Sequence, residues 1–178
     1  MYSKILIVAA TFLMYTILFL VNELLFGFLG FSESVHWVYL PSGLRLMLVL
    51  IFVEWGALGI VLASMFTNQL FYFGGNTLSV IVSGCISGLA PYLARHVCHR
   101  QLGLDLELRN LSSAKLLTVS LVFALISAFM HQVFFAVQGH TDDFIASTSV
   151  MAFGDLIGTV IFLYTAKFVL SKTGLKTH

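Results

Sequence analysis

Three ionisable side chains interrupt apolar stretches of the chain: Arg45, His131 and Asp155. An ionisable group inside a membrane helix is costly unless it faces a cavity or a partner, so such residues are candidates for function. A guanidinium offers a planar cationic fork to an anionic or carbonyl-bearing ligand. Arg45 could instead pair with Glu23 or Asp155 and tie helices together. Both readings stay open at the level of the sequence.

Other polar side chains fall near one end of the same apolar segments, and we call this end the outer end. They are Asn22, Glu23, Asn68, Gln69 and Gln132. At a rise of about 1.5 Å per residue, Arg45 lies about one turn below the outer surface, His131 about two turns, and Asp155 near the midplane. We therefore predict an outward-facing polar cavity. Its ligand-binding residues would be Glu23, Arg45, Asn68, Gln69, His131, Gln132 and Asp155.

Haem binding has little support, because no other histidine matches His131 in depth. His36 and His140 fall in predicted outer loops, and His96 and His99 fall at the opposite face. Haem in a helical bundle needs ligands at compatible depth on facing helices. We expect His131 to be a hydrogen-bonded residue of the cavity or of the packing.

Metal and catalytic patterns are also weak. His96, Cys98 and His99 lack a second cluster with the spacing of metal ligands, and Asp142-Asp143 is typical of a solvated turn. The sequence contains no nucleophile elbow, phosphate-binding glycine loop or carboxylate pair. We expect no enzyme and no metal site, and the sequence names no cofactor.

The composition is that of a membrane protein. Hydrophobic residues make up 59% of the 178 residues and charged residues 10%, and the mean hydropathy is +0.98. Soluble domains carry about 25% charged residues. The net charge of +1 is too small for nucleic-acid binding. Cys85 and Cys98 are not placed to form a structural disulfide.

Apolar segments of membrane-spanning character predict an all-α bundle of about six transmembrane helices in a single domain, residues 1–178. The segments are 5–26, 40–53, 55–73, 77–94, 116–138 and 144–166. The first is too long for a signal-peptide core and has no cleavage site after it. Only Glu54 and the pair Trp55-Gly56 separate the second segment from the third, so one bent helix or a re-entrant hairpin is an alternative there.

Basic residues predict the orientation. With the amino terminus inside, six crossings place all Lys and Arg except Arg45 on the inner side or at inner helix ends. The outer connections 27–39, 74–76 and 139–143 contain neither Lys nor Arg. A single crossing by the second and third segments would place the basic 95–115 loop outside. The charges therefore favour six helices with both termini in the cytoplasm.

Two stretches resemble the membrane-associated sensor domains of the MASE type. The first starts with His36-Trp37-Val38-Tyr39-Leu40-Pro41-Ser42-Gly43-Leu44 and continues through Gly56, Gly59 and Ala63-Ser64. The second is Phe153-Gly154-Asp155-Leu156-Ile157-Gly158, which is similar to the Gly-Asp-x-x-Gly element that closes such domains. The resemblance implies a sensory module of the bacterial inner membrane, commonly fused to a cytoplasmic signalling enzyme.

The chain departs from that pattern, because it is shorter than such domains and only Ser171 to His178 follow Leu170. We therefore expect a lipid-embedded binding module that acts through a separate protein partner, in the membrane or at its cytoplasmic face. Two alternatives remain. One is the substrate-binding subunit of an energy-coupling-factor transporter, and the other is an accessory subunit of a respiratory or photosynthetic membrane complex.

Overall fold

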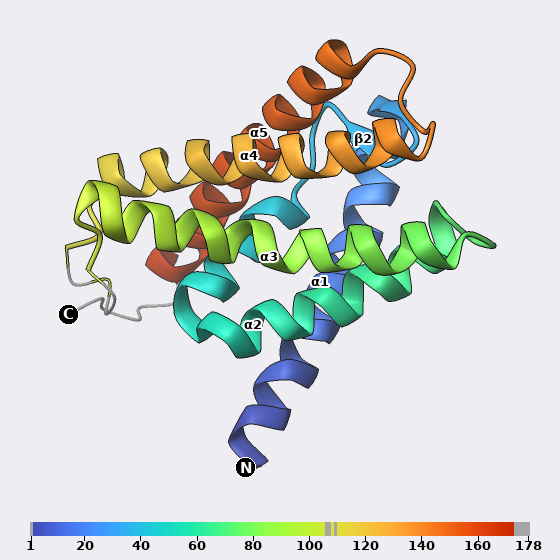
Figure 1. Ribbon diagram of the computed structural model, residues 1–178. Coiled ribbons are helices and arrows are strands. Elements are labelled where there is room, and N and C mark those ends of the chain that lie inside the picture. Colours follow the sequence, from blue (N-terminus) through green and yellow to red (C-terminus); the bar gives the residue numbers. More distant parts are fainter. Residues whose placement is uncertain (1, 106–107, 109, 173–178) are drawn as a thin grey trace.

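The computed structural model describes residues 2–105, 108 and 110–172, and five long helices account for most of them (Figure 1). They are α1 (Tyr2–Phe26), α2 (Pro41–Phe71), α3 (Thr77–Leu102), α4 (Ser113–Val137) and α5 (Phe144–Lys172). The chain between α1 and α2 forms a short 3-10 helix, η1 (Gly27–Leu29), and a hairpin of β1 (Gly30–Ser32) and β2 (Val35–His36). The all-α bundle is confirmed.

Local signals set several helix ends. Pro41 stands in the first turn of α2, where its missing N–H costs no hydrogen bond. Asn76 caps α3 by accepting a hydrogen bond from the Ser79 N–H. Ser112 caps α4 by accepting one from the Lys115 N–H. Gly103 ends α3 in the left-handed conformation at φ 59°. As a result α3 extends to Leu102, beyond the predicted end at residue 94.

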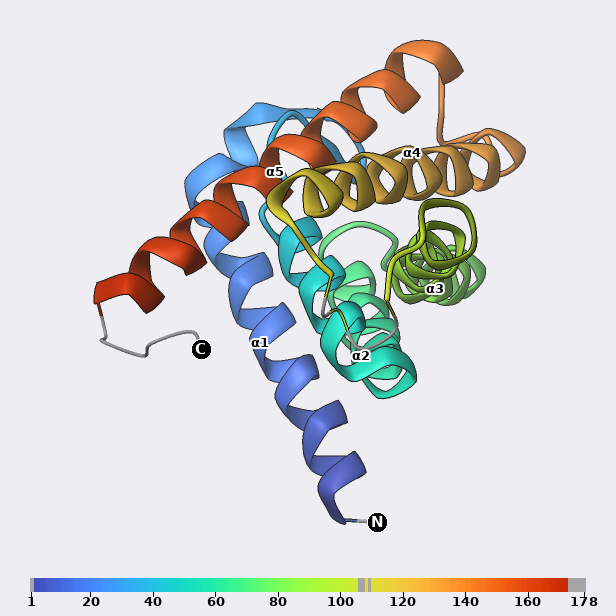
Figure 2. The same ribbon diagram turned by 90° about the vertical axis from the view of Figure 1, so that its left-hand side faces the viewer.

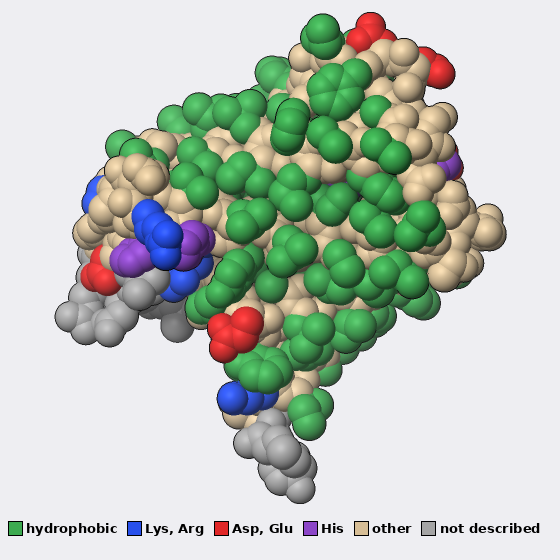
Figure 3. All heavy atoms as spheres, viewed as in Figure 1, with side chains coloured by type: hydrophobic (Ala, Val, Ile, Leu, Met, Phe, Trp, Pro, Cys, Tyr) green, Lys and Arg blue, Asp and Glu red, His purple; other side chains and the backbone are tan. Residues whose placement is uncertain are grey.

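Each of the five helices is long and apolar enough to cross a membrane. Large apolar side chains cover the outside of the bundle, as Figure 3 shows for one face. Lipid accepts such a surface, whereas soluble monomers expose only small apolar patches. The chain is therefore a multi-pass membrane protein.

The described part of the chain has five candidate spanning helices in place of the six predicted, and the difference lies in α2. The predicted segments 40–53 and 55–73 are two arms of one helix that bends at Val53, whose φ is 50° and ψ −118°. In a straight helix, residues eight apart are separated by about 12 Å. A Cβ on Gly56 would lie 2.5 Å from the Leu48 carbonyl oxygen, so the chain folds back sharply here. Figure 1 shows the second arm turning back at this bend, and Figure 2 shows the same bend from a view turned by 90°.

The connections fall into two groups at different ends of the bundle. The β1–β2 hairpin meets the α4–α5 connection, where His140 Nδ1 lies 3.5 Å from Glu33 Oε2. At the other end, Lys4 Nζ lies 4.8 Å from the centre of the Trp55 ring beside the α2 bend. We call these the outer end and the basic end. The predicted inner charges of Arg109 and Lys176 lie outside the described residues.

Small residues allow segments to approach closely inside the bundle. Cβ atoms on Gly154 and Gly158 would overlap the carbonyl oxygens of His36 and Tyr39, so α5 presses against the segment before α2. Gly88 similarly faces Ala57 of α2. These glycines thus serve packing between segments of one chain. Near the basic end the core is apolar, with Leu46, Leu50, Ala90, Ala94, Cys98, Leu104, Val119 and Phe123.

Candidate functional site

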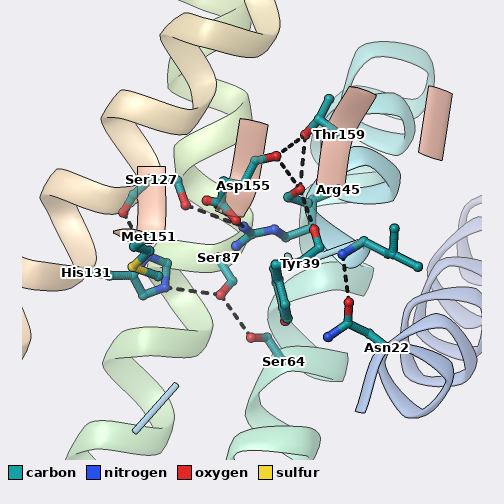
Figure 4. A network of polar contacts seen from close by, with 12 residues as sticks. Asn22, Tyr39, Arg45, Ser64, Ser87, Ser127, His131, Met151, Asp155 and Thr159 are labelled. Atoms are coloured by element: carbon teal, nitrogen blue, oxygen red, sulfur yellow. Dashed lines mark hydrogen bonds and ion pairs between the residues drawn. The ribbon is translucent and has the colours of Figure 1, made fainter. Parts of the chain in front are cut away.

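A buried ion pair between α2 and α5 lies at the centre of the polar site. Arg45 Nη2 donates to both carboxylate oxygens of Asp155, at 3.0 and 3.1 Å, and it lies 3.4 Å from Ser127 Oγ on α4 (Figure 4). The side chains of Arg45 and Asp155 are each 2% exposed. Of the two predicted partners of Arg45, the structure selects Asp155. Together with Ser127, the pair links three helices, and the opposite charges of Arg45 and Asp155 cancel.

The guanidinium of Arg45 also lies between two aromatic rings. Its central carbon is 5.5 Å from the centre of the Tyr39 ring and 5.2 Å from that of Phe123. Cations over aromatic faces are attracted by the ring quadrupole, more strongly when water is excluded. Arg45 Nε is buried and has no hydrogen-bond partner in the structure. The cation is thus firmly held, yet one of its donors is unused.

Backbone contacts hold Asp155 in place. Ser42 Oγ lies 2.7 Å from the carbonyl oxygen of Asp155 and 3.0 Å from Thr159 Oγ1. The Tyr39 N–H donates to the carbonyl oxygen of Gly154, one residue earlier on α5. These bonds exist because Gly154 and Gly158 let the two segments touch. The glycines of the Gly-Asp-x-x-Gly element therefore position the carboxylate between them.

His131 continues the polar site toward α3. Its Nδ1 lies 2.8 Å from the carbonyl oxygen of Ser127, which can only accept, so Nδ1 carries the proton. Its Nε2, 3.3 Å from Ser87 Oγ, then accepts from the serine hydroxyl, and Ser64 donates to Ser87 at 2.9 Å. His131 is therefore a hydrogen-bonded cavity residue, as the sequence suggests.

The remaining predicted residues are divided between the site and its surroundings. Asn68 is buried and donates to Ser83 Oγ at 2.8 Å, whereas its neighbour Gln69 is exposed on α2. Gln132 is buried, but it bonds to Thr141 and Met151. Asn22 accepts from the Leu40 N–H and anchors the start of α2.

Glu23 belongs to a separate cluster near the outer end. It accepts a hydrogen bond from Tyr72 OH at 2.9 Å, and His36 Nε2 lies 2.9 Å from the same hydroxyl. Because Tyr72 donates to Glu23, His36 must donate to Tyr72 through Nε2, which leaves Nδ1 buried without a partner. Burial lowers the pKa of His36 below its ordinary value, and the nearby Glu23 carboxylate opposes this shift.

A cavity of about 20 Å³ lies among these groups. Its lining comprises Ser34, His36, Tyr39, Arg45, Ser64, Asn68, Ser83, Ser87, His131, Met151 and Asp155. Such a volume accommodates about one water molecule. The half-buried Ser34, in the turn between β1 and β2, brings the cavity toward the outer end. Of the predicted ligand-binding residues, Arg45, Asn68, His131 and Asp155 line it, and Glu23, Gln69 and Gln132 do not.

Serines are the residues that sequence reasoning missed. Ser79, Ser83 and Ser87 recur every four residues on α3 and are all buried. Residues four apart share one face of a helix. This periodicity was a usable signal, because a row of buried hydroxyls needs polar partners on the helix that it faces. On α2 these partners include Ser64 and Asn68.

Neither a metal centre nor a disulfide appears among the residues that the structure describes. No group of three or more His, Cys, Asp or Glu side chains is placed to hold a metal ion there. Cys85 and Cys98 are both free thiols. The polar site is thus built from one ion pair, two histidines, an amide and several hydroxyl groups.

Comparison with protein families identifies the chain. Residues 5–172 match the model of the MASE1 family. The chain belongs to the MASE1 family. MASE1 domains are membrane-bound sensor domains, which confirms the resemblance seen in the sequence and makes this chain a sensor-like membrane module. Comparisons with curated proteins and with solved structures gave no match.

Proposed function

We propose that this MASE1 chain is a binding module of the bacterial inner membrane, without enzymatic activity, that receives a small ligand in the cavity beside Arg45 and Asp155. The observation that carries the proposal is a pair of buried, unused polar atoms, Arg45 Nε and His36 Nδ1, on two residues that line this cavity. Buried polar groups normally find a partner, and an unpaired one costs about 1–3 kcal/mol. A ligand with an acceptor and a donor would satisfy both atoms.

Electrostatics favours a neutral ligand over an anion. The Arg45–Asp155 pair is already neutral, so an added anion would leave a net negative charge buried, which is costly in a site with little water. A carbonyl oxygen can accept from Arg45 Nε without adding charge. An attached N–H or O–H can donate to His36 Nδ1. We therefore narrow the anionic or carbonyl-bearing ligand predicted from the sequence to small, neutral carbonyl compounds.

The cavity must open to accept more than a water molecule. The β1–β2 hairpin lies on the outer side of the cavity. It contacts other elements, because Glu33 in its turn meets His140 of the α4–α5 connection. Ligand-driven movement of the hairpin against α4 and α5 would change the bundle. We propose that a separate protein partner, in the membrane or at the cytoplasmic face, reads this change. The family match favours this function over a transporter subunit or an accessory subunit.

Thermal unfolding of the purified protein in mild detergent tests the ligand class. Formamide and acetamide serve as neutral probes, and formate and acetate serve as anions of matched size. We expect the amides to raise the Tm with a saturating dose response, equivalent to about 1.4 kcal/mol at ten times Kd. A non-saturating or absent response to all four probes would contradict the proposal. A saturating response to the anions alone would contradict its neutral-ligand part.

The orientation also belongs to the proposal. The basic end carries Lys4, Arg95, Arg100 and Lys115, which the positive-inside rule assigns to the cytoplasm. Because α2 folds back at Val53, its two arms would cross in opposite directions. This supports six crossings by the five helices of the described chain. In a variant without its two cysteines, Ser34→Cys should react with a membrane-impermeant thiol reagent in intact cells, and Lys4→Cys only after permeabilisation. The reverse pattern would overturn the orientation.

A further inference from the structure

A second cavity lies at the basic end of the bundle, far along α3 from the polar site. It has a volume of about 210 Å³ and lies between the end of α3 and the start of α4. Its lining consists of Cys98, Leu102, Leu104, Lys115, Thr118 and Val119. The lining is mostly apolar and carries one ammonium group. This combination differs from the polar site, which has hydroxyl groups and a neutral ion pair.

Basic side chains gather at the end of α3 that borders this cavity. Arg95, His96, His99 and Arg100 lie on the last turns of α3, close in sequence to the lining residue Cys98. Figure 3 shows lysine, arginine and histidine side chains gathered at the left-hand end of the molecule, where α3 ends and α4 begins, with acidic atoms beside them. The first turn of α4, which includes Lys115, adds the positive end of a helix dipole.

The Lys115 side chain is tethered only loosely. Its Nζ lies 3.3 Å from the carbonyl oxygen of Gly103, a neutral acceptor, and the side chain is half-buried. A hydrogen bond from an ammonium group to an anionic oxygen is shorter and about twice as strong as one between neutral groups. An anionic group at this rim would therefore compete well for Lys115. The adjacent apolar lining would remain for a hydrocarbon chain.

We propose that an anionic phospholipid binds here, with its phosphate at Lys115 and an acyl chain in the cavity. The charge complementarity selects the head group, because basic sites between membrane helices on the cytoplasmic side recognise anionic lipid head groups. The apolar lining favours an acyl chain, because a soluble anion would leave the cavity unfilled. A zwitterionic lipid would fill the cavity but would bring no net negative charge to Lys115. The site lies where phospholipid is always present.

Native mass spectrometry and thermal unfolding of the full chain test this inference. The probes are dioleoyl phosphatidylglycerol, dioleoyl phosphatidylcholine and inorganic phosphate. We expect phosphatidylglycerol alone to remain bound through detergent exchange and to raise the Tm with saturation. Lys115→Gln should weaken its binding about fivefold. Lys4→Gln, which removes the same charge at the same end of the bundle, should leave binding unchanged.

A second variant covers the case in which Lys115→Gln fails to fold. Thr118 lines the cavity and is exposed, so Thr118→Phe fills the cavity from its rim while Lys115 keeps its charge. This variant should lose phosphatidylglycerol selectivity. Equal binding by wild type, Thr118→Phe and Lys4→Gln would overturn the proposal, and so would equal retention of phosphatidylcholine. A matching effect of inorganic phosphate would show an anion site without a lipid.

Discussion

The ion pair between Arg45 and Asp155 allows a quantitative prediction for Asp155→Asn. The substitution keeps the shape of the side chain but removes its charge, so the guanidinium stays buried at 2% exposure without a counterion. Removing one partner of a buried pair typically costs about 3–5 kcal/mol, because the remaining charge is uncompensated. The two bonds at 3.0 and 3.1 Å place this pair in that class. We expect a loss of about 3–5 kcal/mol in the free energy of unfolding.

A double-mutant cycle separates the pair from its individual members. Arg45→Met should cost a similar amount, because it leaves a buried carboxylate alone. The double variant has no uncompensated charge, so its loss should fall below the sum of the two single losses by about 2–3 kcal/mol. Reversible unfolding in mixed micelles of a mild detergent and dodecyl sulfate measures all four proteins. Asp142→Asn, an exposed carboxylate of the α4–α5 connection, should stay within about 0.5 kcal/mol of wild type.

Two outcomes would refute this reasoning. If Asp155→Asn cost only about 0.6 kcal/mol, the contact would be equivalent to an ordinary hydrogen bond between membrane helices. If the two single losses were additive, Arg45 and Asp155 would not act on each other. In either case the polar site would not be organised around an ion pair.

Three further perturbations follow from the structure. Gly154→Ala should lower the free energy of unfolding by about 1–3 kcal/mol, because its Cβ would overlap the His36 carbonyl oxygen. Gly27→Ala is the control and should be tolerated, because its Cβ would lie 3.4 Å from the nearest neighbouring atom. Equilibrium unfolding of both variants measures the difference. The Tm should fall as the pH drops below about 6.5, because unfolded His36 takes up a proton that the folded state, with its lowered pKa, resists. His36→Gln should flatten that slope between pH 5 and about pH 7, and an unchanged slope would assign it to another group. Val53→Gly should be less destabilising than Val61→Gly by about 1–3 kcal/mol, because Val53 has a positive φ and Val61 does not. Equal losses in the free energy of unfolding would show that the bend is unstrained.

Much of the fold could be predicted from the sequence, because a membrane helix needs a long apolar segment and little else. At the outer end of the bundle, the bounds of α1, α4 and α5 agree closely with those of the predicted apolar segments. The α2 bend was harder, because neither proline nor a glycine pair marks Val53. The sequence locates the interruption through Glu54 and the following Trp55-Gly56, but it does not indicate the non-helical backbone of Val53, where the two arms of α2 meet.

The candidate site was predicted in part, for a physical reason. Charged residues such as Arg45 and Asp155 are costly in lipid, so their presence alone indicates a buried polar site. Serine costs little in a membrane helix, so Ser83 and Ser87 gave no comparable signal. Gln69 shows the opposite failure, because a polar residue near a helix end can face away from the bundle at no great cost.

Direct binding of acetamide to two serine variants tests the central claim, that the cavity beside Arg45 and Asp155 is a ligand site. Ser87→Thr keeps the hydroxyl and adds one methyl group to the lining of a cavity of only about 20 Å³. Ser120→Thr makes the same change at a buried serine outside the cavity. Titration calorimetry should show saturable binding to wild type and Ser120→Thr and none to Ser87→Thr. Equal binding to all three proteins, or none to wild type, would contradict the account.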